Sequence, residues 1–305
     1  MTVRQVAITE VLLRDGFQIE PAIIPTADKI QLGRGLLDAG LAGLEAGAFV
    51  NPRKVPQMAD TAEVVGTLRA LAPASRLYTL VFNERGAHRA LAAGVRHVRL
   101  VVSASDGHSH ANAGADTAGA LRRLEPAAAI LKAAGVTLEA SIATAFVCPY
   151  DGETDPDRTA RVAGTLAALG AGPLHLADTI GAAGPWHIER TVAAVRRELP
   201  GGTLGLHLHN TYGMASANAW TGIQLGIRHF DASLGGIGGC PFAPGAAGNI
   251  ATDDLVNLLH HAGIATGVDV DRLVGVRDQL HTLLGRRLDS ALSAAKATPA
   301  KLRTL

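Results

Sequence analysis

The stretch Thr203–Leu234 reads TLGLHLHNTYGMASANAWTGIQLGIRHFDASL and decides the fold. It opens with a short apolar run, Leu204–His209, continues through a longer segment rich in Ala, and closes with a second apolar run, His229–Leu234. Short apolar runs on either side of a helical segment are typical of parallel strands that a crossover helix connects. The stretch therefore predicts one strand–helix–strand unit of a parallel sheet.

The same alternation fills the rest of the chain. Six further strand candidates precede this stretch, each followed by a longer segment rich in Ala and Leu: Val3–Thr9, Gly43–Gly47, Arg76–Phe82, His97–Ser103, Thr137–Ala145 and Leu174–Asp178. Eight such units in 305 residues are what a closed (β/α)8 barrel needs. We therefore expect a single TIM-barrel catalytic domain over residues 1–305, with a short helical extension after about residue 289. An open doubly wound sheet is the alternative, but the first strand is not followed by the Gly-rich phosphate turn of that fold.

Composition narrows the classes of partner. Hydrophobic residues make up 48% of the chain and the formal net charge is +1, with no long basic run, so we expect no nucleic-acid partner. No apolar run reaches the roughly 20 residues of a membrane-spanning helix, so we also expect no membrane partner. Met1–Glu10 alternates like a strand, without a leader pattern, and Cys148 and Cys240 are too few for a disulfide framework. A cytoplasmic enzyme for a small molecule is the expectation, and a homo-oligomer is compatible with it.

Polar residues at the carboxyl ends of the strands identify the candidate active site, because TIM barrels build their sites there. These residues are Arg14 and Asp15 after the first strand, Glu45 near the end of the second, Asp178 at the end of the sixth, and His207 and His209 at the end of the seventh.

The pair of histidines is the sharpest local signal. Residues i and i+2 of a strand point to the same face, so His207 and His209 would enter the barrel mouth together as two ligands of one metal ion. The alternative is two buried histidines that make ordinary hydrogen bonds. Their place at a strand end, with Asp15 available from the first strand, favours the metal site.

Two oxygen donors complete the proposed set. Asp15 offers a carboxylate, although a helix cap or a salt bridge to Arg14 is its alternative role, and Asn249 offers a carbonyl after the eighth strand. Mixed oxygen and nitrogen donors suit Mg²⁺ or Mn²⁺, and the same set also accepts Zn²⁺ or Co²⁺. Asp178 is expected to orient a histidine or a bound water.

A run dense in Gly and small residues, 235–249, follows the eighth strand and contains Cys240. We expect a mobile loop that folds over the mouth and brings this thiol to the reacting atoms. The alternative is a phosphate-cradling or merely flexible loop with an inert thiol. His108 and His110 lie in a polar stretch after the fourth strand, which we expect to be a loop facing solvent or substrate.

With these residues placed, the chain resembles the 3-hydroxy-3-methylglutaryl-CoA lyase family over nearly its whole length. The resemblance is carried, in order along the chain, by RDGFQIE (14–20), FVNPRKVPQMAD (49–60), SASD (103–106) with Asn112 after it, DTIG (178–181), HLHNTYG (207–213), GGCP (238–241) and Gly248-Asn249.

The resemblance implies roles for individual residues. Those implied to bind the divalent cation are Asp15, His207, His209 and Asn249. Those implied to be catalytic are Arg14, Glu45, Asp178 and Cys240, and those implied to bind substrate are Gln18, Ser105 and Asn112.

The implied reaction is a retro-Claisen cleavage of 3-hydroxy-3-methylglutaryl-CoA or a related 3-hydroxyacyl-CoA to acetyl-CoA and a keto acid. Arg14 would stabilise the thioester enolate and Cys240 would protonate its carbon, while a histidine, a metal-bound water or the Cys240 thiolate takes the hydroxyl proton. Two alternatives are a metal-dependent aldolase that acts on a hydroxy keto acid without coenzyme A, and a non-catalytic barrel that binds a metabolite.

Three positions depart from the family pattern. Asn210 stands where the family has Asp, which removes a negative charge beside the metal histidines. Ile19 replaces a polar Asn, and Pro21 stands where a basic residue is expected. These departures widen the expected substrates to other 3-hydroxyacyl-CoAs or a free hydroxy acid.

Overall fold

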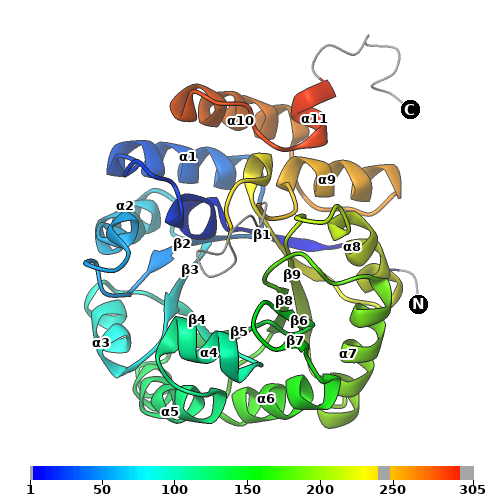
Figure 1. The fold of residues 1–305 in the computed structure, drawn as a ribbon. Coiled ribbons are helices and arrows are strands. Elements are labelled where there is room, and N and C mark those ends of the chain that lie inside the picture. Colours follow the sequence, from blue (N-terminus) through cyan, green and yellow to red (C-terminus); the bar gives the residue numbers. More distant parts are fainter. Residues whose placement is uncertain (1–2, 240–247, 296–305) are drawn as a thin grey trace.

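The computed structural model describes residues 3–239 and 248–295. Within them eight parallel strands close into a barrel that helices surround (Figure 1). Around the barrel the strands follow the order β1 (Ala7–Glu10), β10 (His229–Ala232), β9 (Leu204–Leu208), β8 (Leu174–Asp178), β5 (Thr137–Ala143), β4 (His97–Ser103), β3 (Arg76–Val81) and β2 (Gly43–Ala48), which returns to β1. The predicted TIM barrel is confirmed.

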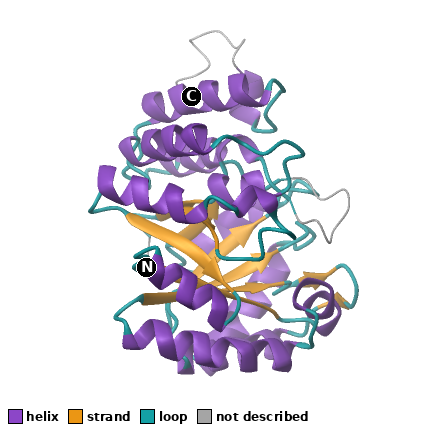
Figure 2. Cartoon of the chain, turned by 90° about the vertical axis from the view of Figure 1, so that its left-hand side faces the viewer, coloured by secondary structure: helices purple, strands orange, loops and turns teal. Residues whose placement is uncertain are grey.

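The outer helices pack around the strands, as the side view in Figure 2 shows, and they bury apolar residues against the strands. They are α1 (Thr26–Asp38), α2 (Thr61–Leu71), α3 (Glu84–Ala92), α5 (Thr117–Ala133), α6 (Pro156–Ala168), α7 (Pro185–Glu198), α8 (Ala215–Gln224) and α9 (Thr252–His261). Outside this ring α10 (Val270–Leu284) packs on α1 and α9, and α11 (Ala291–Ala294) packs on α9.

Several short elements lie at the mouth of the barrel. They are the π-helical turn η1 (Leu12–Gly16), the 3-10 turns η2 (Pro56–Met58) and η3 (Leu234–Gly236), the helix α4 (Asp106–Ala113), and a hairpin of β6 (Val147–Cys148) with β7 (Gly152–Glu153). No helix in the described ranges is long and apolar enough to cross a membrane.

Two predicted segments differ from the structure. The first strand begins at Ala7 rather than at Val3, because β1 pairs with its barrel neighbours only from Ala7 onward. The polar stretch that holds His108 is the helix α4 and not a loop. Asp106 supplies a negative charge in its first turn, and Gly114 ends it in the left-handed conformation with φ 66°.

Glu10 joins the loops that carry the site. Its buried carboxylate accepts hydrogen bonds from the backbone amides of Leu12 and Leu234, both at 2.9 Å, and from Thr252 Oγ1 at 2.7 Å. These contacts tie the turn after β1 to the turn after β10 and to the start of α9. Burial raises the pKa of Glu10 from 4.5 to about 7, although the three hydrogen bonds oppose the shift.

Candidate active site and metal centre

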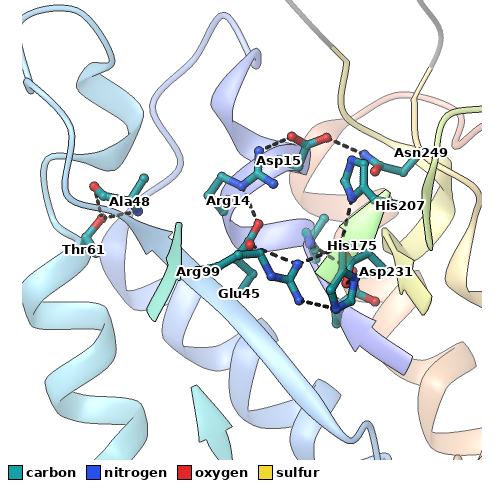
Figure 3. A network of polar contacts seen from close by, with 12 residues as sticks. Arg14, Asp15, Glu45, Ala48, Thr61, Arg99, His175, His207, Asp231 and Asn249 are labelled. Atoms are coloured by element: carbon teal, nitrogen blue, oxygen red, sulfur yellow. Dashed lines mark hydrogen bonds and ion pairs between the residues drawn. The ribbon is translucent and has the colours of Figure 1, made fainter. Parts of the chain in front are cut away.

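Arg14 and Asp15 lie on η1, directly after β1, and their side chains meet above the barrel interior (Figure 3). Arg14 Nε donates to Glu45 Oε2 at 2.5 Å, and Arg14 Nη1 forms an ion pair with Asp15 Oδ1. A planar guanidinium presents its N–H donors in a fixed fork, so carboxylates bound at two of its nitrogens hold the whole group in one orientation. Arg14 is therefore fixed in orientation by two buried acids.

His207 and His209 face the same side of β9, as their spacing predicted. Their Nε2 atoms lie 3.2 Å from each other, and both rings are buried. His209 also forms an isolated antiparallel bridge with Asn249, so the segment after the barrel's last strand returns beside it. The backbone thus brings a third polar side chain to the two imidazoles.

The donor atoms converge on one point. One ligand atom from each of Asp15, His207 and His209 lies within 4.8 Å of the others, and Asp15 Oδ2 is 3.6 Å from His209 Nε2. Asn249 Nδ2 donates to Asp15 Oδ2 at 2.7 Å, whereas its buried Oδ1 has no hydrogen-bond partner among the described residues. Neighbouring ligand atoms that each lie about 2.1 Å from an octahedral ion are about 3 Å from each other. The distance of 3.2 Å between the two imidazole Nε2 atoms matches this value. The site therefore fits a divalent cation, with the unpartnered Asn249 oxygen as a further donor.

The electrostatics keep the key groups charged. Burial alone would raise the pKa of Asp15, but the positive charge of Arg14 and the nearby His209 and His207 outweigh it and lower the pKa to about 2. For Arg14 burial would lower the pKa, and the charges of Asp15 and Glu45 raise it instead. Asp15 is consequently an anion, and Arg14 a cation, across the physiological range.

Gly238 closes over this centre and must be a glycine. Its φ is +114°, and a Cβ there would lie 2.6 Å from Asn249 Nδ2 and 3.2 Å from Asp15 Oδ2. Any side chain at Gly238 would push Asn249 or Asp15 from its place, so the glycine fixes the spacing of these two donors.

Beneath the centre the barrel interior is charged, where TIM barrels usually place branched apolar side chains. Arg99 on β4 is buried, and it contacts Asp231 at 2.7 Å, Glu139 at 3.0 Å and Glu45 at 3.4 Å. Because Glu45 also contacts Arg14, one connected set runs from Arg14 to Asp231 (Figure 3).

The charges of this set support a divalent ion. With Asp15 it holds four carboxylates against two guanidinium groups, which leaves two negative charges when the imidazoles are neutral. Buried charge needs compensation in a low-dielectric interior. A divalent cation at the histidines would supply the missing two positive charges.

The remaining predicted residues lie in different places. Glu45 is fully buried in the middle of β2, not at its end, and reaches the site through Arg14. Gln18 and Asn112 line the cavity at the barrel mouth. Ser105 does not line it: its hydroxyl lies 2.8 Å from that of Thr144, in the layer below the surface.

Asp178 ends β8, as predicted, but its carboxylate faces the turn that follows. It accepts hydrogen bonds from the amides of Ala182 at 3.1 Å and of Ala183 at 3.1 and 3.2 Å. Burial raises its pKa from 3.8 to about 7 in spite of these donors. These contacts make Asp178 an anchor of the β8–α7 turn, and its carboxylate also interacts electrostatically with His207.

The cavity itself is lined by residues from most of the barrel strands. They are Arg14, Asp15, Gln18, Leu80, Phe82, Val101, His108, Asn112, Ser141, Ala143, Ala177, Thr179, His207, His209 and Gly239. His108 is buried, its Nδ1 lies 2.7 Å from Ser103 Oγ, and burial lowers its pKa to about 4. A neutral imidazole thus faces the cavity, whereas His110 on the same helix is exposed.

The three departures from the family pattern lie away from the metal donors. Asn210 is exposed, and its Oδ1 accepts from the amide of Ala215 at the start of α8. Ile19 and Pro21 are exposed on the segment after η1. The Asn210 side chain thus binds the first turn of α8, and the effect of its missing charge on the neighbouring histidines stays a prediction. Cys240 lies outside the described residues.

Sequence reasoning missed the charged layer of Arg99, Glu139, His175 and Asp231. The signal was present, since each is a charged or titratable residue inside an otherwise apolar predicted strand. The predicted site consisted of polar residues at the strand ends, whereas these four residues lie within the strands.

Comparisons with known proteins identify the family. A family model described as HMGL-like matches residues 5–280. The (R)-citramalyl-CoA lyase of Chloroflexus aurantiacus is 42% identical over 299 residues, which cover 95% of this chain and 94% of that protein. The mitochondrial hydroxymethylglutaryl-CoA lyase of Bos taurus is 38% identical over 292 residues, covering 96% of this chain and 90% of that protein.

A solved structure matches just as completely. The crystal structure of hydroxymethylglutaryl-CoA lyase from Pseudomonas aeruginosa superposes with a TM-score of 0.92 at 38% identity, over 96% of this chain and 98% of that one. At these identities and coverages the chain belongs to the HMGL-like family, and like these relatives it is a lyase.

Proposed function

We propose that the enzyme cleaves the C2–C3 bond of a 3-hydroxyacyl-CoA that carries a methyl group on C3 and a terminal carboxylate, releasing acetyl-CoA and a keto acid. The names of two relatives support this class. Hydroxymethylglutaryl-CoA and citramalyl-CoA share the 3-hydroxy-3-methyl thioester and differ by one methylene before the carboxylate. Their cleavage gives acetyl-CoA with acetoacetate or with pyruvate, respectively.

The position of Arg14 is the main observation that supports the proposal. It lines the cavity next to the converging donors of Asp15, His207 and His209. Two carboxylates hold its Nε and Nη1, while its Nη2 makes no hydrogen bond within residues 3–239 and 248–295. A guanidinium that is fixed in place and still has an unused N–H donor can stabilise an oxygen that gains negative charge during the reaction.

The metal set supplies the other half of the chemistry. Asp15, His207, His209 and Asn249 would hold Mg²⁺ or Mn²⁺, because oxygen and imidazole donors suit these ions. When bound, such an ion acidifies a nearby hydroxyl and favours an anionic oxygen.

The residues of this chain then handle the charges and the proton. A base takes the C3 hydroxyl proton, the C3–O bond becomes a carbonyl, and the electron pair of the C2–C3 bond moves into the thioester as an enolate. Arg14 stabilises the enolate oxygen, and a proton added to C2 completes acetyl-CoA. We assign both proton transfers to Cys240, as thiolate and then as thiol, so that the substrate's proton moves from oxygen to carbon with no net change. This assignment rests on the GGCP motif in the sequence.

The test is product analysis with the purified, metal-loaded protein. The panel contains 3-hydroxy-3-methylglutaryl-CoA, both enantiomers of citramalyl-CoA, longer 3-alkyl analogues, and the corresponding free hydroxy acids and hydroxy keto acids. We expect acetyl-CoA, detected by chromatography, from at least one thioester and no cleavage of the free acids. Cleavage of a free hydroxy keto acid without any thioester turnover would establish the aldolase alternative, and binding without turnover would establish the metabolite-binding one.

A further inference from the structure

Asp231 lies directly beside a candidate metal ligand, although it belongs to another strand. It is paired with His207 in the register of β10 on β9, and both side chains point into the barrel. Asp231 Oδ2 is 3.2 Å from His207 Nδ1, the ring nitrogen that faces away from His209 and Asp15. The strand register itself thus places a carboxylate behind this imidazole (Figure 3).

The contact decides which ring nitrogen carries the proton. A carboxylate accepts hydrogen bonds, so His207 donates from Nδ1 to Asp231, and the neutral ring then carries a lone pair on Nε2. Nε2 is the atom that lies 3.2 Å from His209 Nε2, among the donors of the metal centre. Asp231 therefore orients the ring and directs its lone pair to the ion.

Asp231 is in turn held in place by a buried cation. Arg99 Nη1 donates to the same oxygen, Asp231 Oδ2, at 2.7 Å, and both side chains are essentially inaccessible to solvent. On the other side Asp231 Oδ1 lies 3.2 Å from His175 Nδ1. Gly205 makes room for that ring, since a Cβ there would lie 2.7 Å from it. Arg99 therefore holds one carboxylate oxygen of Asp231, while the His175 ring lies against the other oxygen without a hydrogen bond to it.

We propose that Asp231 is a positioning residue for the metal centre, which fixes the tautomer and the orientation of His207 while Arg99 fixes Asp231. The inference rests on the proposed function in one respect, namely that His207 ligates a divalent cation. Carboxylate partners of metal-bound histidines usually raise metal affinity by about 10–100-fold. We therefore expect Asp231 to raise the affinity of the site for a divalent cation by about 10–100-fold.

The experiment compares Asp231→Ala with a matched control, Glu139→Ala. Each variant removes one carboxylate partner of Arg99 from the same buried layer. Of these two carboxylates, only that of Asp231 contacts His207 in the described residues. Asp231→Asn is the second variant, because it keeps the shape and an acceptor oxygen if the alanine variant does not fold. Mn²⁺ affinity is measured by titration calorimetry on metal-free protein, and the tautomer of His207 by ¹⁵N NMR.

We expect Asp231→Ala to weaken Mn²⁺ binding by about 10–100-fold and Asp231→Asn by about tenfold. Glu139→Ala removes the same buried charge without touching His207, so it should weaken Mn²⁺ binding by only about threefold. The metal-free wild type should show His207 protonated on Nδ1, and Asp231→Ala should lose this preference. Equal losses in Asp231→Ala and Glu139→Ala, or unchanged affinity in both Asp231 variants, would overturn the inference. A wild type that binds no Mn²⁺ would instead overturn the proposed metal centre, so the two failures are distinguishable.

Discussion

Replacing Arg14 by lysine should separate its chemical role from its structural one. Removing the charge altogether would leave the buried Asp15 without its arginine partner and Glu45 with Arg99 alone, at a cost of about 3–5 kcal/mol in stability. Lysine keeps the positive charge, so the fold should survive. A lysine ammonium is, however, a point charge on a flexible stem, so it does not hold both acids and a cavity-facing donor in the fixed arrangement of the Arg14 guanidinium.

The expected magnitude follows from this geometry. If Nη2 of Arg14 stabilises the enolate oxygen, its loss removes one charge-directed donor, and such a donor is worth about 10²–10³ in kcat, or about 2.7–4 kcal/mol. Because the interaction is made only in the transition state, KM should change little. The affinity for the cation should stay within about threefold, since Asp15 keeps a positive neighbour.

Steady-state release of acetyl-CoA, measured on the best thioester of the panel, gives kcat and KM for Arg14→Lys. The matched control is Arg34→Lys, which alters an exposed arginine that also pairs with a carboxylate, Asp38 at 2.7 Å. The control should behave as wild type. A kcat for Arg14→Lys within threefold of wild type would refute the role in the transition state. A fall in metal affinity as large as the fall in kcat would assign Arg14 to the metal centre instead.

Further predictions concern the metal, the thiol and a buried acid. His207→Ala and His209→Ala should each lose bound divalent metal while the barrel stays folded; elemental analysis with full metal occupancy in both variants would contradict the ligand assignment. Cys240→Ala should keep metal and substrate affinity but lose turnover by about two orders of magnitude or more, and near-normal activity would leave the thiol without a catalytic role. Glu10 binds its proton more tightly in the folded state, where its pKa is about 7 against the ordinary value of 4.5. The protonated side chain therefore makes its whole contribution to the free energy of unfolding below pH 4.5, and this contribution falls by about 3 kcal/mol as the pH rises to about 7. Glu10→Gln should lack this part of the fall, as denaturant unfolding at pH 5 and pH 8 would show, and an unchanged pH dependence would argue against the raised pKa.

The barrel was predictable because parallel strands that are buried on both faces read as short apolar runs. The runs His97–Ser103 and Leu174–Asp178 agree with β4 and β8 at both ends. The first strand was predicted too long, because Val3 and Val6 are buried outside the barrel sheet, where Gln5 forms only an isolated bridge with Ala265.

The metal donors were predictable from strand periodicity together with the place of the site in TIM barrels. His207 and His209 share a face because they are two residues apart, and Asp15 follows a strand that adjoins theirs through β10. The convergence of Asn249 depends on the bridge to His209, which no local pattern contains.

The charged interior was not predictable from strand ends alone. Asp231 and Arg99 are 132 residues apart, and their ion pair exists only because β10 and β4 face each other across the closed barrel. The contact that the Asn210 side chain makes was not predictable from the motif alone. Its neighbour His209 faces the site, so the strand alternation turns Asn210 outward, where its side chain caps α8.

The most direct test of the account follows the proton that is added to carbon. The metal-loaded enzyme is run in D₂O on the thioester that it cleaves, and the acetyl-CoA is analysed by mass spectrometry. Cleavage through an enolate that Arg14 stabilises predicts acetyl-CoA with one deuterium in its methyl group, together with an undeuterated keto acid at early times. Free coenzyme A with an intact hydroxy acid would contradict the proposed carbon–carbon cleavage, and acetyl-CoA without deuterium would contradict its passage through an enolate that an exchangeable group protonates.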